Sequence, residues 1–288
     1  MAEHDPGPAG VTVAGVTVAV ASRDPEATHR LLAGGLGLPA AGPGRYQLGR
    51  DVALAVHPTT GRAGPTELTL HPGPGAAAPE EAGVFSGVPI RCVTDPLPSP
   101  AAGGQADNIL GLDHIGVAAS DTAGLVAALA GLGFGYESRQ IDTQLAAPIE
   151  VFSSDRYGVV SHSGPPRPAG ALLVTFLRRG GVDIEILQDI MTAGSARPGP
   201  SADGPGSTTG DNRAIARFVA RHGGGPHHLA VRVRDIERGI GGLTDAGVGL
   251  IDTVGRPGSR RSLIAFADRR TTGGLVLHLV QREDPPDQ

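Results

Sequence analysis

Four polar side chains interrupt strands that are otherwise apolar, and their types are those that bind metal ions. They are His114, Glu185, His228 and His278. A buried carboxylate or imidazole loses its hydrogen bonds to water, so each needs a polar partner, and one shared divalent cation would serve all four. Three imidazoles and one carboxylate suit Fe, Co, Ni, Cu or Zn better than Mg or Ca. The sequence therefore predicts a site for a divalent transition metal.

Taken one at a time, these residues have simpler explanations. A single strand histidine is more often a core or edge residue with satisfied hydrogen bonds, and Glu185 could pair with Arg178. The occurrence of all four together favours a shared site. Glu185 and His278 are also the candidate catalytic residues, because His278 could act as a base instead of binding the metal. His227 is expected to point to the opposite face, since side chains alternate along a strand.

The stretch 211–233 indicates how the chain would present one of these histidines. Apolar residues recur at helical spacing from Ile215 to Val219, and the three glycines at 223–225 end this helix. From His227 the pattern alternates as in a β-strand. We therefore expect His228 at the start of a strand, directly after a turn.

One order of elements, a strand followed by a helix and three strands, recurs along the chain. Repetition of such a unit is typical of a fold built from similar modules. A shortened fourth copy is expected at 83–93. The first copy is a strand at 11–20, a helix from Asp24 and strands at 46–48, 52–56 and 67–70; the second is a strand at 112–119, a helix at 121–132 and strands at 149–152, 172–177 and 182–187; the third is a strand from 228, a helix after 235 and strands at 248–251, 263–266 and 275–280.

The repeat predicts an α+β fold of tandem βαβββ modules. The Pro-rich segment 96–105 carries no apolar pattern and is suited to an extended linker. The first module has Val16 and Thr17 where the second has His114, so we expect its role to be packing or shaping a pocket. The predicted domains are a degenerate N-terminal unit at 1–95, a linker at 96–108, a metal-binding paired-module domain at 109–283 and a tail at 284–288.

Five segments of the C-terminal part form a set of motifs: 112–117, 211–233, 256–258, 264–266 and 272–281. Together they resemble methylmalonyl-CoA epimerases, a branch of the vicinal oxygen chelate superfamily that also contains glyoxalases and extradiol and hydroxyphenylpyruvate dioxygenases. The resemblance implies a half-barrel of paired modules, with metal ligands on the first and last strands of each module. It also implies a substrate with two adjacent oxygens, and a homodimer.

The chain departs from the epimerase pattern at two positions. His278 stands where the epimerases carry a carboxylate, and Val174 stands where they carry an acid/base glutamate. If a proton is abstracted, a histidine that does not bind the metal, or Glu150, Asp142 or Tyr157, must carry it.

The loop 255–261 contains three arginines, and in the resembling family this loop lies close to the substrate. Arg256, Arg260 and Arg261 are therefore candidates for binding a carboxylate or phosphate group. The alternative is that they are solvated surface charges.

Three functions are compatible with these residues. The resemblance implies an isomerase or epimerase that stabilises an enolate of a carbonyl or acyl-thioester substrate through its metal. An Fe(II)-dependent dioxygenase-like enzyme is the first alternative, and a non-catalytic binder of small molecules such as drugs is the second.

Composition excludes several other classes of partner. The net charge of -5 over 288 residues gives no electrostatic footprint for nucleic acid. No apolar run approaches the length of about 20 residues that a membrane-spanning helix needs, and no signal peptide is visible at the N-terminus. The single cysteine, Cys92, cannot form an internal disulfide. We expect a cytoplasmic protein whose partner is a small molecule.

Overall fold

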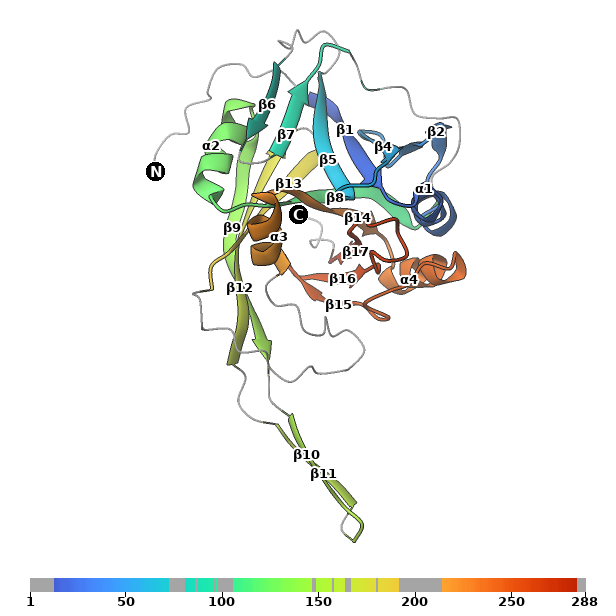
Figure 1. Ribbon diagram of the computed structural model, residues 1–288, viewed down its shortest axis with the longest axis vertical. Helices are drawn as coiled ribbons and strands as arrows, with labels where there is room; N and C mark the ends of the chain where they lie inside the picture. Colours follow the sequence, from blue (N-terminus) through green and yellow to red (C-terminus); the bar gives the residue numbers. More distant parts are fainter. Residues whose placement is uncertain are drawn as a thin grey trace.

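Two curved sheets, one from each half of the chain, lie next to each other in the computed structural model (Figure 1). A separate two-stranded hairpin projects away from them. No helix in the described part of the chain is long and apolar enough to cross a bilayer. The described residues are 13–72, 81–85, 88–95, 97, 106–146, 149–156, 158–163, 167–179, 181–191 and 214–283.

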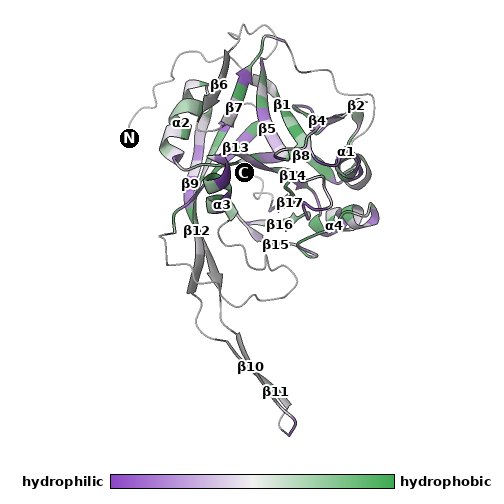
Figure 2. Ribbon diagram, in the orientation of Figure 1, coloured by the Kyte–Doolittle hydropathy of each residue, from purple (hydrophilic) through white to green (hydrophobic). Residues whose placement is uncertain are grey.

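The N-terminal half forms a seven-stranded sheet in the order β2-β3-β4-β1-β5-β7-β6. Hydrophobic and hydrophilic residues alternate along β5, as expected for a strand that packs on the core with only one face (Figure 2). The strands are β1 Val13–Ser22, β2 Ala40–Gly42, β3 Arg45–Gln47, β4 Val52–Pro58, β5 Gly64–Pro72, β6 Glu81–Phe85 and β7 Val88–Cys92.

The C-terminal half forms an eight-stranded sheet in the order β15-β16-β17-β14-β8-β13-β12-β9. Its two modules meet where β8 and β14 pair in antiparallel fashion. The predicted half-barrel of paired modules is thereby confirmed. The strands are β8 Ile109–Ala118, β9 Gly135–Ala146, β12 Arg167–Arg179, β13 Val182–Asp189, β14 Gly225–Val233, β15 Arg256–Gly258, β16 Ser262–Phe266 and β17 Leu277–Arg282, and the hairpin is β10 Ile149–Ser154 with β11 Gly158–Ser163.

Three of the helices begin in the same way, directly after the first strand of a module. Asp24, Asp121 and Asp235 are their N-caps, and each carboxylate accepts a hydrogen bond from the backbone N–H three residues later. The shared cap supports the repeat that the sequence predicts. The helices are α1 Pro25–His29, continued by the π-helical stretch η1 Arg30–Gly35, then α2 Thr122–Gly131, α3 Ala214–His222 and α4 Ile236–Asp245.

The N-terminal sheet differs from the prediction of one degenerate module at 11–70 followed by a shortened copy at 83–93. The three strands after its helix are β2, β3 and β4, whereas the segment 67–70 belongs to β5, which pairs with β1 in antiparallel fashion. β7 then pairs with β5 in parallel, as β17 does with β14. The N-terminal half is thus also a pair of modules, of which the second, β5 to β7, has no helix among its described residues. Most of the linker predicted at 96–108 lies outside the described residues.

In the C-terminal half, the strand predicted at 149–152 is confirmed but lies outside the main sheet, and the strand predicted at 248–251 was wrong. Residues 149–152 lie in β10 of the projecting hairpin, and β9 takes their expected place in the sheet. At 248–251 the structure has only an isolated bridge from Leu250 to Ala267, and the strand comes later, as β15. The predicted strands at 172–177, 182–187, 263–266 and 275–280 correspond to β12, β13, β16 and β17.

Candidate metal centre

The four candidate ligands lie on one face of the eight-stranded sheet, in two neighbouring rows. Each row runs across three adjacent strands and has a small residue at its middle position. The rows are Glu185–Gly116–His228 across β13, β8 and β14, and His114–Ala230–His278 across β8, β14 and β17. Strand pairing therefore brings together side chains that are far apart in the sequence.

The small residues make room for the imidazole rings. A Cβ atom placed on Gly116 would lie 2.0 Å from Cε1 of His228, so that no other amino acid fits there without moving this ring. Ala230 pairs with both His114 and His278, and its side chain is only a methyl group. Neither residue is predicted from the sequence, although a glycine within an apolar strand is a signal of a close approach.

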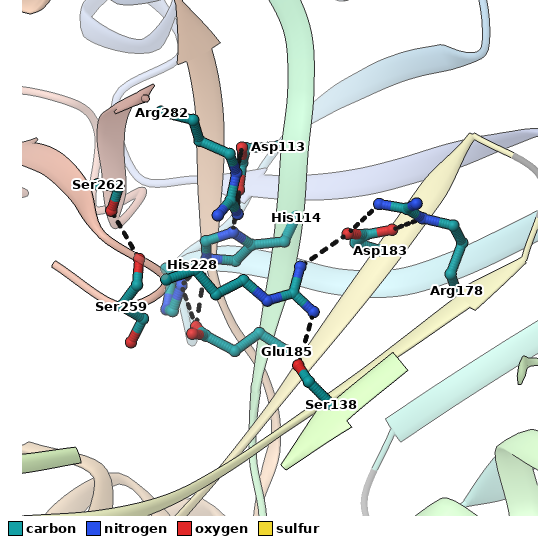
Figure 3. A network of polar contacts seen from close by, with 11 residues as sticks. Asp113, His114, Ser138, Arg178, Asp183, Glu185, His228, Ser259, Ser262 and Arg282 are labelled. Carbon is teal, nitrogen blue, oxygen red and sulfur yellow. Dashed lines mark hydrogen bonds and ion pairs between the residues drawn. The ribbon is translucent and has the colours of Figure 1, made fainter. Parts of the chain in front are cut away.

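Three of the four side chains converge at one point (Figure 3). Nε2 of His114 lies 3.2 Å from Nε2 of His228 and 3.2 Å from Oε2 of Glu185, and the same carboxylate oxygen lies 3.4 Å from Nε2 of His228. The ring of His278 follows at centroid distances of 4.8 Å from His228 and 5.3 Å from His114. All four side chains are buried, with 4–5% of their surface exposed.

These residues fit a divalent metal ion. Ligand atoms bound at about 2.1 Å from a common ion lie about 3.0–3.4 Å apart, which is the spacing of the three converging atoms. The three histidines offer nitrogens that lie within 4.8 Å of one another. Nδ1 of His278 is buried and has no hydrogen-bond partner among the described residues, as expected for a polar atom whose environment a cation would complete.

The electrostatics of the cluster also favour a cation. Burial alone would lower the pKa of His114, but the charge of Glu185 and the hydrogen bond to Asp113 raise this pKa to about 9. Burial would likewise raise the pKa of Glu185, and the charge of His114 instead holds it well below its usual range. Burial lowers the pKa of His278, helped by the charges of His228 and His114. These directions favour a positively charged His114 beside the carboxylate of Glu185. A bound cation would take the place of that positive charge.

A carboxylate orients the first of these histidines. Nδ1–H of His114 donates to Oδ1 of Asp113 at 2.7 Å, and Nε of Arg282 donates to Oδ2 of the same carboxylate at 2.7 Å. This arrangement leaves Nε2 of His114 directed at the cluster, as is usual where a carboxylate supports a metal-binding imidazole. Asp113 can reach its neighbour because it is an extra residue in β8: Ala230 pairs with His114 and Val231 with Leu112.

Aromatic rings enclose the cluster on two sides. Phe176 meets the ring of His114 edge-on at 5.7 Å, and Phe266 lies 4.4 Å from the ring of His278. The guanidinium of Arg260 lies 3.4 Å above the centre of the Phe176 ring. Apolar walls and one cation therefore border the donor atoms.

Comparison with known proteins gives this arrangement a family. A sequence profile of the glyoxalase/bleomycin resistance protein/dioxygenase superfamily matches residues 113–266, more than half of the chain. The chain belongs to this superfamily. Its members typically bind a divalent metal, and the three buried histidines offer ligand atoms for such an ion. Among curated proteins, no sequence matches the chain.

Two solved structures illustrate the range of the superfamily. Methylmalonyl-CoA epimerase from Mycobacterium tuberculosis is 21% identical, with a TM-score of 0.43 over 64% of this chain and 95% of its own. A mutant of 4-hydroxymandelate synthase from Streptomyces coelicolor is 16% identical, with a TM-score of 0.55 over 97% of this chain and 94% of its own. The second similarity extends over both halves and shows a shared fold.

The three arginines that the superfamily resemblance singles out have different places. Arg260 lies at the cluster and donates to Oγ of Ser138 at 3.0 Å. Arg256 pairs with the buried carboxylate of Asp252 at 3.0 Å, and its guanidinium lies 5.4 Å from the Phe266 ring. Arg261 lines a separate cavity of about 420 Å³ that none of the four candidate ligands lines. The structure thus brings Arg260 to the site and Arg256 to its border.

The described candidates for carrying a proton have other places in the fold. Val174 is buried in an apolar group with Ile215 of α3, so the position of the superfamily's epimerase glutamate is filled by packing. A carboxylate oxygen of Asp142 forms a short contact with the hydroxyl of Ser259. Glu150 belongs to the projecting hairpin, and Tyr157 lies outside the described residues.

Proposed function

We propose that this protein is a metal-dependent vicinal oxygen chelate enzyme of the isomerase or epimerase type. His114, Glu185, His228 and His278 would hold a divalent transition metal. When bound, the metal would act as a Lewis acid on a carbonyl or acyl-thioester substrate with two adjacent oxygens and would stabilise its enolate.

The observation that carries the proposal is the number of donors that meet on one face of the sheet. Two imidazoles and a carboxylate lie within 3.2–3.4 Å of one another, and a third buried imidazole lies beside them. Iron oxygenases typically use two histidines and one carboxylate, which leaves more positions open for substrate and O2. A fourth donor favours Lewis-acid chemistry, because two neighbouring substrate oxygens need fewer open positions.

The surrounding residues support binding of a small anionic substrate. Phe176 and Phe266 exclude water from the donors, which strengthens electrostatic interactions there. Arg260 places a guanidinium over Phe176, where it can orient a carboxylate or phosphate group. Backbone φ angles of 56° and 53° at Arg260 and Arg261 are unusual for residues other than glycine, and such outliers often mark functional loops.

Elemental analysis of the purified protein and of two variants, His228→Ala and His278→Ala, tests the proposal. Loss of about one equivalent of metal in both variants supports the four-donor site, and cobalt, nickel or zinc supports Lewis-acid chemistry. Loss in His228→Ala alone would assign His278 as a base. A wild-type protein that neither contains nor takes up metal would contradict the proposal and would favour the non-catalytic binder.

An Fe(II)-dependent dioxygenase-like enzyme is the second candidate. The specific observation for it is that the three converging residues, His114, His228 and Glu185, are themselves two histidines and one carboxylate. Anaerobic loading with Fe(II), followed by measurement of O2 consumption over candidate aromatic 2-oxo acids, separates the two. Iron-dependent O2 uptake that persists in His278→Ala would favour the oxygenase.

Two further properties stay predictions: a cytoplasmic location and a homodimer. Light scattering on the eluting chromatographic peak measures the mass of the assembly directly, and a value near that of one 29.1 kDa chain would contradict the dimer.

A further inference from the structure

The second histidine of the pair at the start of β14 has an unexpected position. Strict alternation would send the side chains of His227 and His228 to opposite faces, but the two imidazoles are in contact, with 3.1 Å between their Nδ1 atoms. The reason is an irregularity in the strand pairing: Pro226 pairs with Val117 and His228 with Gly116, so that His227 is an extra residue in β14. The expectation that His227 points to the opposite face is therefore wrong.

A β-bulge next to a candidate ligand occurs twice at this site. Asp113 is the extra residue in β8 and contacts Nδ1 of His114, and His227 is the extra residue in β14 and contacts Nδ1 of His228. In both pairs, Nε2 of the supported histidine faces the cluster. Each bulge thus turns the residue beside a candidate ligand toward that ligand's outer nitrogen.

We propose that His227 is a positioning residue for His228. Its Nδ1 accepts the Nδ1–H of His228 and fixes the tautomer in which Nε2 of His228 carries the lone pair directed at the cluster. This inference rests on the proposed function, because that tautomer is the one a metal requires. The imidazole of His227 would thus accept the hydrogen bond from His228, as the carboxylate of Asp113 accepts the one from His114.

The neighbours of His227 hold it for this role. Its ring meets Phe218 of α3 edge-on, at 4.8 Å and 84°. Arg62, from the loop between β4 and β5, places its guanidinium 4.7 Å from the centre of the same Phe218 ring and donates a hydrogen bond to the carbonyl of Pro226.

Through Arg62 the N-terminal half takes part in the site. This half contributes none of the four candidate ligands. Its β4–β5 loop, however, supplies Arg62, which packs beside His227, the residue in contact with His228. The hydrogen bond from Arg62 to Pro226 thus connects the N-terminal half to the strand that carries His228.

A pair of variants with the same number of side-chain heavy atoms and the same branching tests the role. Asn at position 227 keeps an acceptor oxygen near the place of Nδ1, and Leu has the same branching without it. We expect His227→Leu to weaken Co(II) binding about 10–100-fold, the usual cost of removing an outer partner of a ligand, and His227→Asn to stay close to wild type. Binding is followed by the visible absorption of Co(II), and the melting temperature of the metal-free proteins checks that each variant folds.

His222→Leu is the matched control, since His222 also contacts the Phe218 ring, at 4.8 Å, without touching a candidate ligand. Nitrogen NMR of the zinc-loaded wild type should show the proton of His228 on Nδ1. Arg62→Met should weaken Co(II) binding less than His227→Leu does.

The outcomes separate the inference from the proposed function. If His227→Leu binds Co(II) as tightly as wild type, or if His227→Asn binds as weakly as His227→Leu, the acceptor role is overturned while the metal site stands. If the wild type itself binds no Co(II), the metal site fails, and the role of His227 fails with it.

Discussion

The two halves of this protein place their central strands in the same order, yet only one half gathers metal ligands. In the N-terminal sheet β4, β1, β5 and β7 are neighbours, as β13, β8, β14 and β17 are in the C-terminal sheet. A row across the first set carries Ala53, Thr17, Thr69 and Arg91, whereas the matching strands of the second carry the rows with the three histidines and Glu185. Strand order thus brings the rows into place, and residue type decides what they can bind.

The one buried histidine of the N-terminal sheet sharpens this contrast. His71 lies within β5, where Nε2 is 2.8 Å from the hydroxyl of Thr17 and Nδ1 is 3.0 Å from the carbonyl of Asp95. Both of its nitrogens therefore have local partners. The C-terminal cluster is different because its imidazoles face one another.

The largest effect is expected from a change that fills the space in which the ring of His228 lies. Gly116→Ala adds a carbon 2.0 Å from the ring of His228 and should displace it, lowering metal affinity at least about 100-fold, more than the loss of an outer partner costs. Calorimetric titration with Zn(II) measures the affinity. Gly131→Ala is the control, since a Cβ atom there meets no heavy atom within 4 Å. Unchanged affinity in Gly116→Ala would mean that the row geometry does not define the site.

A smaller effect is expected from the carboxylate that orients His114. Asp113→Asn removes the charge that faces Nδ1–H of His114 and Arg282, and it should weaken metal binding about tenfold. Asp183→Asn is a matched control, because Asp183 accepts hydrogen bonds from Arg178 at 2.6 and 2.9 Å and contacts none of the histidines. Equal losses in the two variants, in the same Zn(II) titration, would point to general electrostatics instead of orientation.

The smallest effect on metal binding should come from the N-terminal sheet. His71→Leu leaves the hydroxyl of Thr17 and the carbonyl of Asp95 without this partner, so stability should fall by about 1–2 kcal/mol, the usual cost of losing two such bonds. Metal content should not change. Urea unfolding gives the stability, and elemental analysis on the same preparation gives the metal content. A loss of metal in His71→Leu would contradict the conclusion that only the C-terminal half gathers metal ligands.

The sequence predicted what depends on local pattern. His114, Glu185 and His278 stand out because they interrupt apolar runs, and the helix before His228 follows from its spacing and its glycines. The bulges at Asp113 and His227 could not be predicted in this way, because a bulge is a property of the register between β8 and β14. The second module of the N-terminal half was predicted only as a shortened copy at 83–93, because its described residues contain no helix, and a helix is the strongest periodic signal of the repeat.

The seam between β8 and β14 runs directly through the cluster, and this has a consequence for dynamics. His114 and His228 belong to different modules and lie 114 residues apart, so an ion that binds both also cross-links the modules. Binding to the folded state alone stabilises it in proportion to the logarithm of ligand concentration. The protection gained should concentrate on the backbone amides of these two strands, where hydrogen exchange requires the modules to separate. Metal supply would then set how long the two C-terminal modules stay joined, independently of any turnover.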